Sequence, residues 1–170
     1  AAADLVVTKP GGSTLMEAFA AGLPVEVFFC RIGGWDTHSN QAVDHANLMR
    51  TLGGSVHAFH QDLASIQTAS GNAQDRVMIL GYSEFGRRVQ ENNGGTDHGT
   101  AGLSFCAGNA VLGGLYGGYP DLGNLDANGN MRYTTDFRSL YATVLDRWLG
   151  QAPGATDALL GRSYDRLGFL

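Results

Sequence analysis

Two short polar clusters contain the side chains best suited to chemistry. The first is the segment 35–38, Trp-Asp-Thr-His, which follows an apolar run from Val25 to Ile32. The second lies within residues 82–100, which follow the apolar run 77–80. In open α/β sheets, ligands bind beyond the carboxyl ends of the strands, so we expect both clusters to meet at one sheet edge around a metal ion. The candidate ligands are Asp36, His38, Glu84, Asp97 and His98.

These residue types match the ligands that catalytic metal sites use. Catalytic zinc takes about three protein ligands and keeps one position open, and Asp36, His38 and His98 form such a set. Asp97 or Glu84 would then accept hydrogen bonds from the imidazole N–H groups. A shell of oxygen atoms around Glu84 would suit magnesium, calcium or manganese better than zinc. A purely structural interpretation stands beside this one, because aspartates often cap turns.

Arg87 lies between the two ends of the second cluster and is a candidate catalytic residue. A divalent metal would polarise a phosphoryl or sulfuryl oxygen and lower the pKa of its bound water. The Arg87 guanidinium could bind a tetrahedral anion through two parallel hydrogen bonds. The expected partner is therefore a small anionic ester.

Periodicity and turn residues predict the elements that would position these clusters. Residues 1–32 show a β-α-β pattern with strands at 4–8 and 23–32, which should be parallel. A helix with Thr14 and Glu17 as its capping box connects them. The later elements are a helix over 40–68, which Gly53-Gly54 could kink, a strand at 77–81, a strand within 101–115, a helix over 136–149 capped by Thr135, and a helical turn in the last twenty residues or so.

Together these elements predict an α/β fold of three layers, with a mostly parallel sheet of about four or five strands and helices on both faces. A length of 170 residues is most simply a single domain over 1–170. The segment 126–130, Asp-Ala-Asn-Gly-Asn, resembles the start of a calcium loop. Phe137 stands where that loop needs its last acidic ligand, so we interpret the segment as a turn.

Composition limits the classes of partner. Hydrophobic residues make up 44% and charged residues 16%, which is typical of a globular protein. The net charge of −5 gives no basic footprint, so we expect no nucleic-acid partner. No apolar run approaches the roughly 20 residues of a membrane span, and the alanines at 1–3 show no signal peptide. Cys30 and Cys106 are interpreted as two buried reduced thiols. Compartment and oligomeric state stay open.

The opening sequence, ADLVVTKPGGSTLMEAFAAGLPV, resembles the UDP-binding segment of GT-B glycosyltransferases. The resemblance implies that a glycine-rich turn and a helix N-terminus bind the diphosphate, which agrees with the anion affinity of such ends. It also implies that Glu17 binds ribose. The implied nucleotide-binding residues are Gly11, Gly12, Ser13, Thr14 and Glu17. The alternative is a β-α-β scaffold without a ligand.

Residues 25–170 resemble the C-terminal part of domain-of-unknown-function family 1501, which is alkaline-phosphatase- and sulfatase-like. The motifs are VFFCRIGGWDTHSNQ, ILGYSEFGRRVQENNGGTDHGTAG, GGLYGGYPDL and TTDFRSLYATVLDRWLG. The resemblance implies that Asp36 and His38 bind a first metal and that His98 returns to it. Phe85 stands where relatives have a histidine ligand to a second metal, so that second site is weakened or lost. Relatives of this segment are often exported.

The two resemblances meet near Val25, which suggests an engineered or recombined chimera. The alternative is one natural protein with a coincidental β-α-β match. The glycosyltransferase-like segment stands where relatives carry their nucleophile, and Ser13 is the candidate substitute. Three functions follow: a metal-dependent phospho- or sulfo-ester hydrolase remnant, a UDP-binding module, or a scaffold without ligand or activity.

Overall fold

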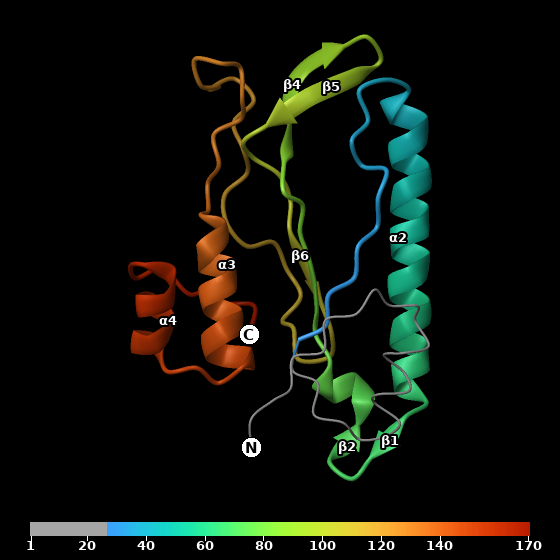
Figure 1. Ribbon diagram of the computed structural model, residues 1–170, viewed down its shortest axis with the longest axis vertical. Coiled ribbons are helices and arrows are strands. Elements are labelled where there is room, and N and C mark those ends of the chain that lie inside the picture. Colours follow the sequence, from blue (N-terminus) through green and yellow to red (C-terminus); the bar gives the residue numbers. More distant parts are fainter. Residues whose placement is uncertain (1–26) are drawn as a thin grey trace. The chain divides into compact units, whose positions relative to one another are not determined.

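The computed structural model describes residues 27–170 (Figure 1). These residues fall into two compact units, one ending at Val77 and the other running from Met78 to Leu170. The expectation of a single domain over 1–170 stays a prediction. None of the helices in the described part combines the length and apolar character needed to cross a membrane.

The first unit is built on one long helix, α2 (Gln41–Ala64). It begins after Asn40, whose backbone is left-handed at φ 51° and whose amide donates to Asp44 at 3.2 Å. The helix runs through Gly53 and Gly54 without a break, so the helix predicted over 40–68 is confirmed, although it ends earlier. Leu63, near its end, is fully buried.

Short elements follow α2 and hold its C-terminal end. They are β1 (Gln67–Thr68), β2 (Gly71–Asn72) and the 3-10 helix η1 (Ala73–Arg76). The Asn72 side-chain amide donates to the Ala64 carbonyl at 2.9 Å, and the Gln74 side-chain amide donates to the His60 carbonyl at 3.0 Å. The first bond satisfies one of the carbonyls that the helix end leaves without a partner in the helix.

The second unit contains two antiparallel strand pairs. One joins β3 (Ile79–Gly81) to β6 (Phe105–Ala107). The other is a hairpin of β4 (Gly86–Asn92) and β5 (Gly95–Gly99). The strands expected at 77–81 and within 101–115 are confirmed as the shorter β3 and β6.

The predicted sheet architecture is wrong. The sheets in the described residues are two-stranded and antiparallel, and no three-layer, mostly parallel sheet with helices on both faces is present there. The reason is local: Asn93 and Gly94 take positive φ values of 56° and 80°, which turns the chain straight back as a hairpin. The described part of the strand expected at 23–32, residues 27–32, forms no strand. The earlier predicted strand and helix lie outside the described residues.

The C-terminal helices form the best-buried part of this unit. They are α3 (Phe137–Thr143), a π-helical turn η2 (Val144–Trp148) that continues it, and α4 (Pro153–Leu160). In Figure 1, α3 and α4 lie side by side. The last helix expected over 136–149 is confirmed, but Asp136 caps it in place of Thr135. The buried residues here are Ser139, Leu140, Ala142, Thr143, Thr156, Tyr164 and Phe169.

Polar contacts tie the C-terminal tail to these helices. The Arg166 side chain pairs with Asp146 at 2.7 Å and with Asp157 at 2.8 Å. The Leu167 amide donates to the buried Thr143 hydroxyl at 2.7 Å. The tail is thus held to η2 and α4 by partly buried charge-assisted bonds, which are stronger than neutral ones.

Both cysteines are free thiols. Cys106, on β6, is half-buried, and that burial raises its pKa. Cys30 is exposed, so the expectation that both thiols are buried is wrong for Cys30. Residues 27–32, the described part of the apolar run that contains Cys30, form no buried strand, and most of them are exposed.

Candidate metal centre

The segment 35–38 alternates between covered and exposed side chains. Trp35 packs its ring edge-on against His45 of α2, with centroids 5.6 Å apart. Thr37 is 7% exposed, and its amide donates to the Trp35 carbonyl at 2.9 Å in a tight turn around Asp36. Asp36 and His38 are exposed. The alternate residues therefore anchor the segment and leave the carboxylate and the imidazole accessible.

Asp36 and His38 face each other directly. His38 Nε2 lies 2.8 Å from Asp36 Oδ1, with the two side chains 52% and 60% exposed. An ion pair as exposed as this contributes about 0–1 kcal/mol to stability. The pair also presents one nitrogen and one oxygen atom from a single short segment. Both atom types bind divalent metal ions such as zinc.

His98 lies in the second unit, on β5, directly opposite Arg87 of β4 in the hairpin register. Its ring stacks on Phe85, with centroids 4.0 Å apart and ring planes 5° from parallel. Its backbone carbonyl accepts a hydrogen bond from Arg88 Nε at 3.3 Å. Both the backbone and the ring of His98 are therefore held by residues of β4 or the segment leading into it.

Arg87 has structural contacts as well as a candidate catalytic role. Its guanidinium donates to the Thr96 carbonyl across the hairpin. The guanidinium carbon also lies 5.0 Å from the centroid of the Phe85 ring, within cation–π range. A guanidinium has five N–H donors in a fixed plane, which is the geometry that binds tetrahedral anions and carboxylates.

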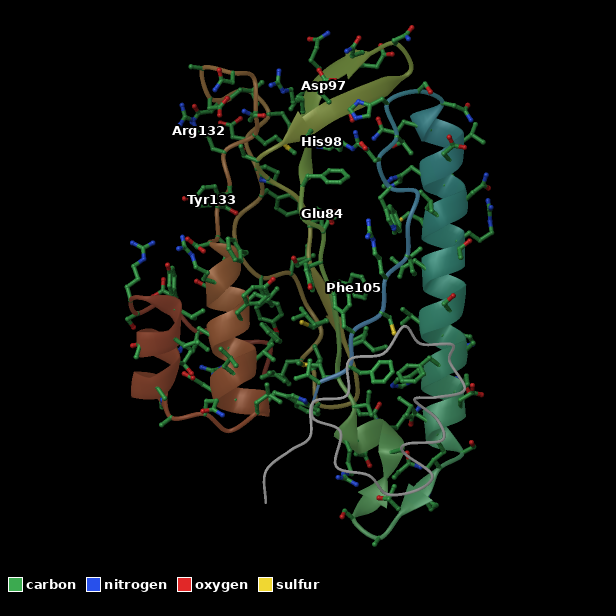
Figure 2. All side chains as sticks on the ribbon, in the orientation of Figure 1. Glu84, Asp97, His98, Phe105, Arg132 and Tyr133 are labelled. Atoms are coloured by element: carbon green, nitrogen blue, oxygen red, sulfur yellow. The ribbon has the colours of Figure 1, made fainter. Side chains whose placement is uncertain are left out.

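Glu84 and Asp97 occupy different positions in the second unit. Figure 2 shows Glu84 on the segment that leads into the hairpin and Asp97 next to His98 on β5. Glu84 is exposed. Consecutive strand residues project to opposite faces, so Asp97 and His98 leave β5 in opposite directions.

Two pairings among the candidate residues are therefore observed within single units, Asp36 with His38 and Arg87 with His98. That the two polar clusters meet around one metal stays a prediction. The candidates in the first 25 residues lie outside the described residues; they are Gly11, Gly12, Ser13, Thr14 and Glu17.

The turn at 126–130 is confirmed as a turn. Asp126 accepts hydrogen bonds from the Asn128 amide at 2.9 Å and the Asn130 amide at 2.8 Å. The Asn130 side chain also donates to this carboxylate, and these bonds lower the pKa of Asp126. N–H donors thus surround the carboxylate, which favours the structural interpretation over a calcium ligand.

Sequence reasoning missed the role of Phe85. It identified this residue only as a departure from a histidine-containing motif. The structure shows it as the stacking partner of His98. A signal was present, because Asn93-Gly94 predicts a two-residue hairpin turn. The hairpin brings the residues on either side of it together.

A protein-family model described as "Protein of unknown function (DUF1501)" matches residues 4–163 of the chain. The match runs through residues 4–25 and across the expected join near Val25. A separate glycosyltransferase segment and a chimeric origin therefore find no support in the comparisons. Neither the curated proteins nor the solved structures that were compared with the chain gave a match.

Proposed function

Because the chain belongs to the DUF1501 family, we propose that it supplies the metal-binding part of an alkaline-phosphatase-like hydrolase acting on phosphate or sulfate esters. The observation that carries the proposal is the contact of 2.8 Å between Asp36 Oδ1 and His38 Nε2. The family resemblance of these two residues and of His98 supports the same interpretation, and Glu84 and Asp97 would accept hydrogen bonds from the imidazole groups.

The Asp36–His38 geometry suits a shared metal ion. In a tetrahedral site, metal–nitrogen and metal–oxygen bonds of about 2.0–2.2 Å put neighbouring ligand atoms roughly 3.3–3.6 Å apart. The observed separation of 2.8 Å is shorter, so metal binding would require the pair to open and the hydrogen bond between the two side chains to be lost. The cation would activate a water molecule and polarise the ester oxygen.

Arg87 would bind the anionic group of the ester. Its planar guanidinium can donate two parallel hydrogen bonds to a tetrahedral anion, while the contact with Thr96 fixes its position. Ser13 stays the sequence-based candidate for the nucleophile. Each of these roles is a proposal about the same site.

Zinc titration of the chelator-treated full chain tests the proposal. We expect saturable zinc binding by the wild-type chain. H38A removes a direct ligand, so it should reduce the zinc affinity by more than the roughly 10–100-fold that is typical when a residue hydrogen-bonded to a ligand is removed. H98A tests whether the second unit supplies a ligand, and should weaken zinc binding to a similar extent.

The matched control is H57A. His57 is an exposed histidine of α2 in the same unit as His38, so its loss removes a zinc-competent imidazole without touching the pair. Zinc binding that H38A and H57A reduce equally would indicate adventitious surface binding and would overturn the proposal. Absence of zinc, manganese, magnesium and calcium binding by the wild-type chain would overturn it as well.

A further inference from the structure

The stack between Phe85 and His98 is a closely defined contact of a candidate ligand in the second unit. The rings are nearly parallel, at 5°, with a centroid distance of 4.0 Å. Arg87 places its guanidinium carbon 5.0 Å from the Phe85 centroid. Phe85 is half-buried, whereas His98 is exposed. The phenyl ring is therefore the fixed partner of the two.

The backbone beside the stack explains why the rings can approach. Gly86 and Gly99 are paired residues at the open end of the hairpin. A Cβ atom on Gly86 would lie 1.7 Å from the Ala101 carbonyl oxygen, and one on Gly99 would lie 2.6 Å from the Arg87 carbonyl carbon. Only glycines permit this close packing, which brings Phe85 and His98 together.

The geometry of the stack also determines what it leaves accessible. Phe85 covers a face of the imidazole, whereas both ring nitrogens lie in the ring plane and point along it. The phenyl ring thus restricts rotation of the His98 ring without competing for its nitrogen lone pairs. A group that orients a ligand in this way lowers the ordering cost of binding.

We propose that Phe85 is a positioning residue, which fixes the plane of the His98 imidazole for metal binding while Arg87 holds the phenyl ring from within the same strand pair. The inference rests on the proposed metal-binding function. It adds a specific role for an aromatic residue that does not itself ligate.

The test compares F85L, which keeps an apolar side chain but removes the aromatic face, with F85Y, which keeps the ring. Zinc affinity and the NMR shifts of the His98 ring protons are measured on the full chain. We expect upfield-shifted His98 protons in the wild type and in F85Y, and loss of that shift in F85L. Zinc affinity should fall about 10-fold or more in F85L and recover in F85Y.

Two further variants separate positioning from general destabilisation. F137L removes an aromatic ring from α3 that packs edge-on against Tyr141, and it should leave zinc affinity unchanged. In the H98A background, F85L should have no additional effect on zinc affinity, because Phe85 acts through His98. A structural effect of F85L would persist in that background.

The outcomes distinguish this inference from the function on which it rests. If the wild type binds zinc and F85L binds it equally well, the positioning role is overturned while the metal-binding proposal stands. Equal losses in F85L and F85Y would also overturn the positioning role, since the aromatic face would not be the cause. If the wild type binds no metal, both proposals fall, and the His98 proton shifts still report whether the rings stack.

Discussion

At the residue scale, the exposed pair of Asp36 and His38 contrasts with Asp136, which is partly buried and caps the start of α3. The first pair is more than half exposed, so water screens it and its effect on stability is small. Asp136 is 16% exposed and bonds Arg138 through both carboxylate oxygens, at 2.9 and 2.7 Å. The same residue type is therefore accessible to solvent in one place and stabilises a helix start in the other.

Asp136 makes stability depend on pH. The hydrogen bonds from Arg138 lower the pKa of Asp136 from 3.8 to about 2. Because the folded-state pKa is the lower one, the stabilisation is complete above the unfolded-state value and is lost as the pH falls through about 2. We expect D136A to lower the free energy of unfolding by about 1 kcal/mol at pH 7, as measured by urea denaturation.

D136N is the matched variant for this effect. Asparagine caps helices as well as aspartate does, so it should keep the bond from the Arg138 amide. It loses the charge and one of the two acceptor oxygens that face the Arg138 guanidinium, and its stability should depend less on pH between about 4 and 2 than that of the wild type. Identical pH profiles for D136N and the wild type would show that the Asp136–Arg138 pair does not stabilise the fold.

At the element scale, the β4–β5 hairpin depends on glycines at both ends. Asn93 and Gly94 form its turn with positive φ values, while Gly86 and Gly99 pair where it opens. The sequence predicted α2 and α3 well, because their apolar residues recur at a helical period that local chemistry alone can satisfy. The predicted elements included no strands within residues 82–100, so the hairpin was missed, although Asn-Gly is a strong hairpin signal.

G86A tests the close backbone packing at the open end of the hairpin. A methyl group at this position would meet the Ala101 carbonyl oxygen, which is backbone and can move only if the strand moves. We expect a loss of about 1–3 kcal/mol in the free energy of unfolding, with faster amide hydrogen exchange in β4 and β5.

The control for G86A is G113A. Gly113 lies in an exposed segment, and a Cβ there would have no atom within 4 Å. Its substitution should change stability by no more than about 0.5 kcal/mol. If G86A proves as mild as G113A, then the approach of Gly86 to Ala101 does not constrain the hairpin.

At the scale of the whole molecule, one family match spans both segments that the residue patterns assigned to two unrelated families. The sequence suggested two unrelated pieces because a glycine turn followed by a helix start is a general anion-binding pattern. Short patterns of this kind recur in many folds and carry little information about origin. The longer set of motifs within residues 25–170 identified the family, which the match over residues 4–163 confirms. The pairing of β3 with β6 could not be predicted from such motifs, because it depends on contacts between residues that are distant in the sequence.

UDP binding distinguishes a single-family chain from a glycosyltransferase chimera. A UDP site with a Kd of about 10 μM would stabilise the chain by about 2.7 kcal/mol at 1 mM UDP, which thermal denaturation detects readily. Because the family model runs without interruption through the glycine-rich turn and Glu17, we expect no change in Tm with UDP. Zinc, in contrast, should raise Tm in the same assay. A saturable rise in Tm with UDP that is absent in E17A would restore the glycosyltransferase interpretation of the first 25 residues. A general anion effect, or binding of UDP at the metal site, would persist in E17A, because neither requires the ribose-binding glutamate.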